Sequence, residues 1–88
     1  MEATDISETT LQQALHNEAH SIWHPVGTCR MGTDRASVVT PELEVHGVRG
    51  LRVADASVMP TIIRGHTHAP SLLIGAKAAD LIAAANRR

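Results

Sequence analysis

Aromatic side chains are almost absent: Trp23 stands alone, and the 88 residues include no Phe and no Tyr. A core without such large anchors must be built from Leu, Val, Ile and Ala, although aromatic residues usually supply much of the buried area. The single cysteine, Cys29, excludes an internal disulfide and a multi-cysteine zinc site. We expect Cys29 to be a buried, inert thiol. A chain of this length forms one small domain at most.

The chain also lacks an excess of either sign of charge, because it has eight Lys and Arg and nine Asp and Glu, and its formal net charge is -1. The only basic cluster is the last two residues, so nucleic-acid binding is not expected. No apolar run is long enough to cross a bilayer, and residues 1–5 have neither the basic nor the apolar region of a signal peptide. The sequence therefore predicts a cytoplasmic location with no membrane segment.

The longest apolar stretch covers residues 71–85 and predicts a helix. Pro70 fits the first helical turn, and Thr67 or His68 lies near the cap position. Apolar and alanine residues cover most of the helical surface, which predicts a buried helix that packs on a sheet. The fold class expected is α/β, or α+β for the chain taken alone. The free N–H groups and the partial positive charge at such a helix start stabilise a group that gains negative charge.

A second, amphipathic helix is expected at about residues 8–19. Asp5 or Ser7 is its expected cap residue, and the Glu8 side chain is expected to reach back to the backbone N–H of the cap. Its polar face carries His16 and His20 four residues apart, a spacing that can place two imidazoles on one metal.

His24 follows His20 by another four residues, which raises the possibility of a third ligand. The helix lacks the Glu of the zincin pattern, and Pro25 forces His24 into extended backbone. We therefore expect no metal site, and solvated histidines on the helix.

Two short strands are expected. Residues 21–32 read as a strand that enters a tight loop, and residues 51–55 as a strand with apolar positions. At the first strand, His24 is either a functional imidazole or a packed side chain. At the end of the second, Asp55 either meets a cofactor hydroxyl or phosphate or caps a turn.

Three blocks of sequence together resemble the C-terminal segment of the glucose-methanol-choline (GMC) flavin oxidoreductases. They are HPVGTCRMG at residues 24–32, VHGVRGLRVADASVMP at 45–60 and GHTHAPSLLIGAKAADLI at 65–82. The match runs from about residue 11 to residue 82. It is specific, because the three blocks occur in the order and at the spacing of the family.

The resemblance implies a protein that binds FAD and oxidises an alcohol to a carbonyl by hydride transfer to the flavin. It implies that residues 1–46 contribute to the substrate side and that residues 47–88 are the last strand and helix of the FAD-binding domain. His24 matches the active-site histidine, and His66 matches the second catalytic position, which is His or Asn in the family. The positions that match stretches approaching the flavin are Asp55, Ala56, Thr67 and His68.

These roles agree with the chemistry of the residues. A neutral imidazole can take the hydroxyl proton during hydride transfer, and we assign this base to His24. A second imidazole, His66, can hold the developing alkoxide by a hydrogen bond. The helix that starts near Pro70 can stabilise negative charge on the flavin.

Three differences from the family pattern matter. Arg64 precedes Gly65 where a small or neutral residue is expected, and His68 stands where Asn is usual; both bear on the substrate. No GxGxxG follows a strand anywhere, so the dinucleotide-binding fingerprint is absent. We expect part of a longer or split enzyme, inactive alone, whose partners are a small alcohol and the missing N-terminal FAD-binding portion. The alternative is a noncatalytic fragment that binds a partner.

Overall fold

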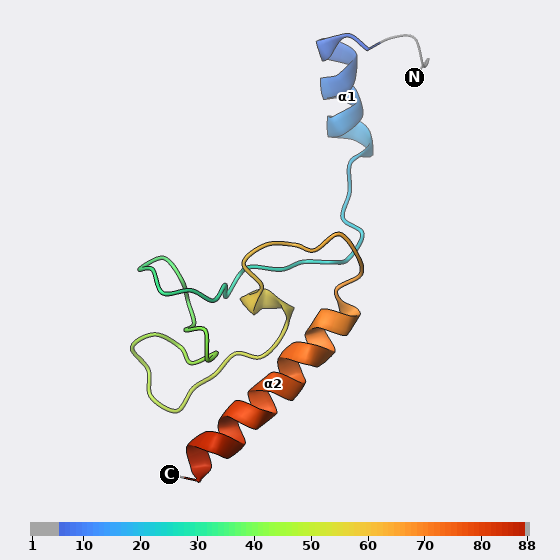
Figure 1. The fold of residues 1–88 in the computed structure, drawn as a ribbon. Helices are drawn as coiled ribbons and strands as arrows, with labels where there is room; N and C mark the ends of the chain where they lie inside the picture. Colours follow the sequence, from blue (N-terminus) through green and yellow to red (C-terminus); the bar gives the residue numbers. More distant parts are fainter. Residues whose placement is uncertain (1–5, 88) are drawn as a thin grey trace.

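The computed structural model describes residues 6–87. It contains the helices α1 (Glu8–Glu18) and α2 (His68–Asn86) and a short 3-10 helix, η1 (Ala56–Val58). The molecule is elongated, with extents of 64 × 27 × 15 Å, and α1 stands apart at one end (Figure 1). Within the described residues, α1 contacts neither η1 nor α2 and buries none of its own residues.

The N-terminal helix has the extent that its sequence predicts, ending one residue early at Glu18. Ser7 is its cap, and the Ser7 hydroxyl accepts a hydrogen bond from the Thr10 backbone N–H. The Glu8 carboxylate does not reach back as expected but accepts from the Gln12 side chain at 3.2 Å, because residues four apart lie on one helical face. The alternative cap, Asp5, lies outside the described residues.

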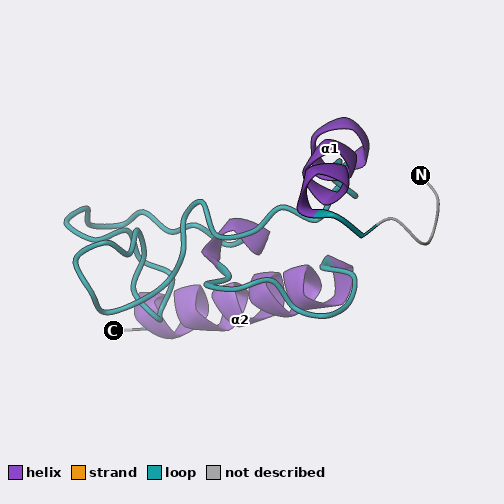
Figure 2. Ribbon diagram, turned by 90° about the horizontal axis from the view of Figure 1, so that it is seen from above, coloured by secondary structure: helices purple, strands orange, loops and turns teal. Residues whose placement is uncertain are grey.

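The C-terminal helix is confirmed, with Thr67 as its cap residue and Pro70 in its first turn. Its expected burial on most of its circumference is wrong for the described chain, since Ala78 is its only buried residue. Ile74 and Leu81 share that packed face. One layer of loop lies along α2 (Figure 2), so side chains on other faces stay exposed, as in Leu73 at 69%.

The strands predicted at residues 21–32 and 51–55 are wrong for the described residues, which contain isolated bridges in place of strands. The bridges join Met31 to Val39, Val39 to Val45, and Glu44 to Arg52. Short extended segments need several consecutive partners to form a stable sheet, and each segment here meets a partner at one residue. The packing of α2 on a sheet therefore stays a prediction.

A small aliphatic core joins the loops to α2. Val39 and Val58 are fully buried, Leu43 is nearly so, and Ala78 closes the cluster from the helix. This agrees with the expectation of a core without aromatic anchors.

None of the helices in residues 6–87 is both long and apolar enough to span a bilayer. The N-terminal residues 1–5, on which the expectation of no signal peptide depends, lie outside the described part of the chain.

Candidate active site

Two segments far apart in the sequence, residues 21–25 and 62–66, lie side by side near the start of α2 (Figure 1). Together they line a cleft of about 510 Å³. Its polar side chains include His24, Arg64 and His66. The cleft therefore contains both residues that the resemblance places at catalytic positions.

A direct hydrogen bond joins the two histidines. His24 Nε2 and His66 Nδ1 are 2.9 Å apart although the residues are 42 positions apart in sequence. The ring centroids are separated by 4.9 Å, and the ring planes are tilted by 49°. One nitrogen donates and the other accepts, so the pair presents a proton donor and a proton acceptor at one place.

The other nitrogen of His24 is shielded from water. His24 Nδ1 is buried and has no hydrogen-bond partner within residues 6–87, whereas His66 is exposed as a residue. A buried polar atom without a partner is uncommon and often marks a functional position. The pair thus joins an inner, partly buried ring to an outer ring that a ligand can reach.

Local backbone geometry places His24. Trp23 has φ of 67°, in the left-handed region, and its side chain is 87% exposed. Pro25 restricts His24 to extended backbone. Gly27 has φ of 92°, and its carbonyl accepts a hydrogen bond from the Arg30 N–H at 3.2 Å, which closes a turn. Within this turn, the Cys29 N–H donates to the Ser57 carbonyl at 2.9 Å. The segment that carries His24 is thereby fixed to η1.

The start of α2 follows directly after His66. Thr67 is the cap residue, and its side chain makes no cap hydrogen bond. Its carbonyl accepts from Ser71, both from the backbone N–H at 3.0 Å and from the hydroxyl at 2.6 Å. The N–H groups of His68 and Ala69 have no partner in the described chain. Two backbone donors and the positive end of the helix dipole therefore lie beside the histidine pair.

Asp55 and Ala56 lie at η1 and do not line the cleft. Asp55 Oδ1 accepts from the Ser57 N–H at 2.8 Å and from the Ser57 hydroxyl. The hydrogen bond from the Ser57 side chain is the main cause that lowers the pKa of Asp55. Of the two roles left open for this residue, capping is the one seen here, and the role toward a cofactor stays a prediction.

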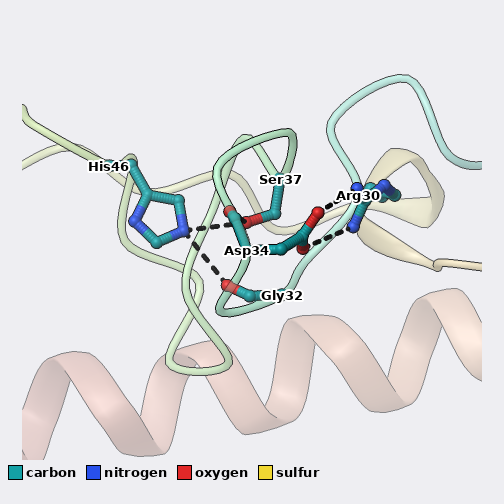
Figure 3. Close-up of polar contacts among 5 residues, drawn as sticks. All are labelled: Arg30, Gly32, Asp34, Ser37 and His46. Carbon is teal, nitrogen blue, oxygen red and sulfur yellow. Dashed lines mark hydrogen bonds and ion pairs between the residues drawn. The ribbon is translucent and has the colours of Figure 1, made fainter.

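The sequence analysis missed a network around His46 (Figure 3). His46 is exposed as a residue, yet its Nε2 lies 3.0 Å from Ser37 Oγ and 3.1 Å from the Gly32 carbonyl. The Ser37 hydroxyl donates to the Asp34 carbonyl at 2.6 Å, and the Asp34 carboxylate pairs with Arg30 at 2.6 Å. No sequence signal pointed to it, because the partners meet across an irregular loop.

This network holds loops and does not resemble a serine nucleophile with its base. A carbonyl oxygen only accepts, so the contact with Gly32 requires a proton on His46 Nε2. A protonated Nε2 cannot take the proton of Ser37, whose hydroxyl already donates to Asp34. The arrangement therefore ties the turn at residue 46 to the loop at residues 32–37.

No group of three metal-ligating side chains comes together in the part of the chain that the structure describes. His16 and His20 lie on the exposed surface of α1 or just after it, while His24 is engaged with His66.

Comparison with known proteins agrees with the resemblance. A family profile described as GMC oxidoreductase matches residues 1–75. An uncharacterized GMC-type oxidoreductase of Mycobacterium tuberculosis is 66% identical over 80 residues, which is 91% of this chain and 15% of the relative. The alcohol dehydrogenase [acceptor] of Pseudomonas putida and the oxygen-dependent choline dehydrogenase of Escherichia coli are each 49% identical over 76 residues, covering 86% of this chain and 14% of each relative.

The profile covers most of the chain, and the matched residues include both histidines of the cleft and the start of α2. The chain belongs to the GMC oxidoreductase family and corresponds to its C-terminal segment. It spans about 15% of the length of the curated relatives that it matches.

Proposed function

We propose that this segment supplies the proton-handling side chains of an FAD-dependent oxidoreductase that converts a CH–OH group into a carbonyl. The observation that carries the proposal is the 2.9 Å hydrogen bond between His24 Nε2 and His66 Nδ1 in the cleft. The names of two relatives, an alcohol dehydrogenase and a choline dehydrogenase, support an alcohol as substrate.

His24 is the proposed base. The substrate hydroxyl enters between the two rings and takes over both halves of their hydrogen bond, donating to His24 Nε2 and accepting from His66 Nδ1–H. As the O–H bond breaks, its electron pair stays on oxygen and its proton forms an N–H bond on His24. His66 stabilises the negative charge that develops on oxygen. The exposed position of His66 leaves room for its ring to turn aside.

The donors at the start of α2 fit an electron-rich cofactor edge. GMC oxidoreductases are in general flavin-dependent, and FAD, when bound, accepts the hydride. We assign the cofactor side to Asp55, Ala56, Thr67 and His68. The unpaired N–H groups of His68 and Ala69 are suited to donate to flavin carbonyl oxygens. The capping role of Asp55 leaves Oδ2 free of any partner in the described chain.

We assign residues 1–46 to the substrate side and residues 47–88 to the FAD-binding side of the complete enzyme. The exposed apolar face of α2 supports this division, because Leu72 and Leu73 are 63% and 69% exposed. Such a face on a well-formed helix is normally covered by another layer. The proposed partner is the N-terminal FAD-binding portion.

The test uses a hybrid enzyme in which this chain replaces the matching 76 residues of the Pseudomonas putida alcohol dehydrogenase. In this hybrid, His24→Ala should slow flavin reduction by alcohol by roughly two to four orders of magnitude, the range of general-base catalysis. Stopped-flow absorbance measures the rate. FAD content should not change, because His24 is proposed to act on the substrate.

The matched control is His20→Ala, which removes an exposed imidazole outside the cleft whose Nδ1 lies 3.0 Å from the Glu18 carbonyl oxygen. Its flavin reduction should equal that of the parent hybrid. If His24→Ala also reduced flavin at the parental rate while retaining FAD, His24 would be a packing residue and the proposal would be wrong.

A further inference from the structure

We infer that the alcohol bound in this cleft carries an anionic group and that Arg64 binds that group. This inference rests on the proposed function for the chemistry at the hydroxyl. The binding of the anion itself can be measured without any oxidation.

Arg64 lies in the cleft with the histidine pair, two residues before His66. Its guanidinium has no hydrogen bond or ion pair within residues 6–87, whereas Arg30 and Arg52 are both paired with carboxylates. Unpaired arginines on open surface are ordinary, because water satisfies them. Arg64 is also exposed, and what distinguishes it is that it lines the cleft that contains the histidine pair.

The cleft offers no negative charge to Arg64 or to a ligand. No Asp or Glu of the described chain lines it, and its other walls include the apolar side chains of Ile22, Ile62 and Ile63. A cationic ligand would meet Arg64 with no carboxylate to offset the repulsion. An anionic ligand would meet a guanidinium whose planar fork matches a carboxylate with two parallel hydrogen bonds.

The isoleucines of the cleft indicate that the rest of the ligand is apolar. Ile62 and Ile63 are 58% and 42% exposed, so each still has apolar surface for a hydrocarbon chain to cover. Residues 64 and 65 form a bend, and two residues of backbone span at most roughly 7 Å. The Cα atoms of Arg64 and His66 are therefore close enough for a ligand with a short alkyl chain to contact both residues. The substrate class is therefore an alcohol with a carboxylate, or a similar anion, a few carbons from the hydroxyl.

The proposed preference for an anionic alcohol implies a substrate different from that of one relative. The Escherichia coli relative is named for choline, which carries a permanent positive charge beside its hydroxyl. With Arg64 in the cleft and no lining carboxylate, we expect choline to be a poor substrate.

The experiment compares three alcohols of matched length in the hybrid enzyme: ω-hydroxyhexanoate, n-hexanol and ω-hydroxyhexyl-trimethylammonium. The parent should prefer the anion. Arg64→Gln should lower kcat/KM for ω-hydroxyhexanoate by roughly 10- to 100-fold, mainly through KM, as expected when a charge-assisted hydrogen bond is lost. It should leave n-hexanol nearly unchanged. Arg64→Glu should reverse the order and favour the cation.

Arg49→Gln is the matched control, because it removes an exposed arginine outside the cleft; its order of substrates should be parental. Arg64→Lys keeps the charge without the fork and should fall between the parent and Arg64→Gln. Retention of FAD by each variant shows that it has folded.

A second measurement separates the two proposals. Calorimetry with hexanoate, which has no hydroxyl to oxidise, reports the anion site alone. If no alcohol reduced the flavin yet hexanoate bound and lost at least tenfold in affinity in Arg64→Gln, the alcohol oxidation would be wrong and the anion site would stand. If hexanoate bound the parent and Arg64→Gln equally, or if the parent preferred the cationic alcohol, the inference would be overturned.

Discussion

At the residue scale, the histidine pair depends on two short segments that meet only in the folded chain. Pro25 and the turn at Gly27 orient His24 from one side, and His66 arrives from the loop before α2. The local sequence did not decide whether His24 is a functional residue or a packed side chain. The resemblance to the family identified both histidines as candidate catalytic residues. No pattern of local spacing could have predicted a contact between residues 42 positions apart.

The exposed member of the pair should tolerate an amide. In the hybrid enzyme, His66→Asn should keep measurable turnover, because Asn can also donate a hydrogen bond to the developing alkoxide. His66→Ala removes the donor and should lower kcat by roughly two to three orders of magnitude, as for a lost oxyanion donor. Steady-state kinetics with matched FAD content gives both values. Equal losses in the two variants would contradict the hydrogen-bonding role.

At the scale of elements, the two helices could be predicted and the strands could not. Helical hydrogen bonds join residues four apart, so the cap at Ser7 and the proline in the first turn of α2 are visible in the local sequence. A strand depends on a distant partner. Residues 51–55 have strand composition, yet Arg52 makes one bridge to Glu44 and no ladder follows.

For the same reason, α2 is less buried within the described chain than its composition predicts. Its apolar composition predicts how much surface could be covered, whereas the packing partner decides how much is covered. Within the described chain that partner is a loop layer held by the His46 network, so only the face with Ala78 is buried.

The loop at residues 30–37 has a measurable electrostatic signature. The Arg30 guanidinium, through its hydrogen bonds, lowers the pKa of Asp34 from 3.8 to about 2. A depressed carboxyl pKa adds stability above the unfolded value, and this stability is lost as the pH falls from about 3.8 to about 2. Carboxyl carbon shifts in an NMR titration of the chain measure the midpoint.

Arg30→Gln should return the Asp34 midpoint toward 3.8. Arg52→Gln is the control, because Arg52 pairs with Glu44 and not with Asp34. A low midpoint that persisted in Arg30→Gln would show that backbone N–H groups, and not the ion pair, hold the carboxylate in its charged form.

At the scale of the whole molecule, much apolar surface remains uncovered. Large exposed hydrophobic side chains occur on every part of the described chain: Ile6, Leu11, Leu15, Ile22, Trp23, Val38, Val48, Leu51, Ile62, Ile63, Leu72, Leu73 and Ile82. A small elongated body with so few buried residues gains little free energy from its own core. Extensive apolar surface of this kind is typical of interaction sites, and it supports the proposed contact with the N-terminal FAD-binding portion.

The chain produced alone should therefore retain no FAD and oxidise no alcohol. The cleft and the start of α2 offer a few donors, but the sequence has no GxGxxG cradle for the pyrophosphate. Absorbance of bound flavin after desalting measures retention. Adding the N-terminal portion of the Pseudomonas putida relative in trans should restore binding. Stoichiometric FAD on the isolated chain would refute this expectation.

Trp23 is an intrinsic fluorescent probe of this chain. It is the only aromatic residue of the sequence, so the ultraviolet fluorescence of the isolated chain comes from a single indole next to His24. Because that indole is 87% exposed, its emission begins at the long wavelengths typical of water. A protein portion that binds at this end of the molecule and covers the indole should shift its emission to shorter wavelengths. A flavin bound nearby should quench the emission by energy transfer. Assembly beside the histidine pair can thus be followed by light, without a label.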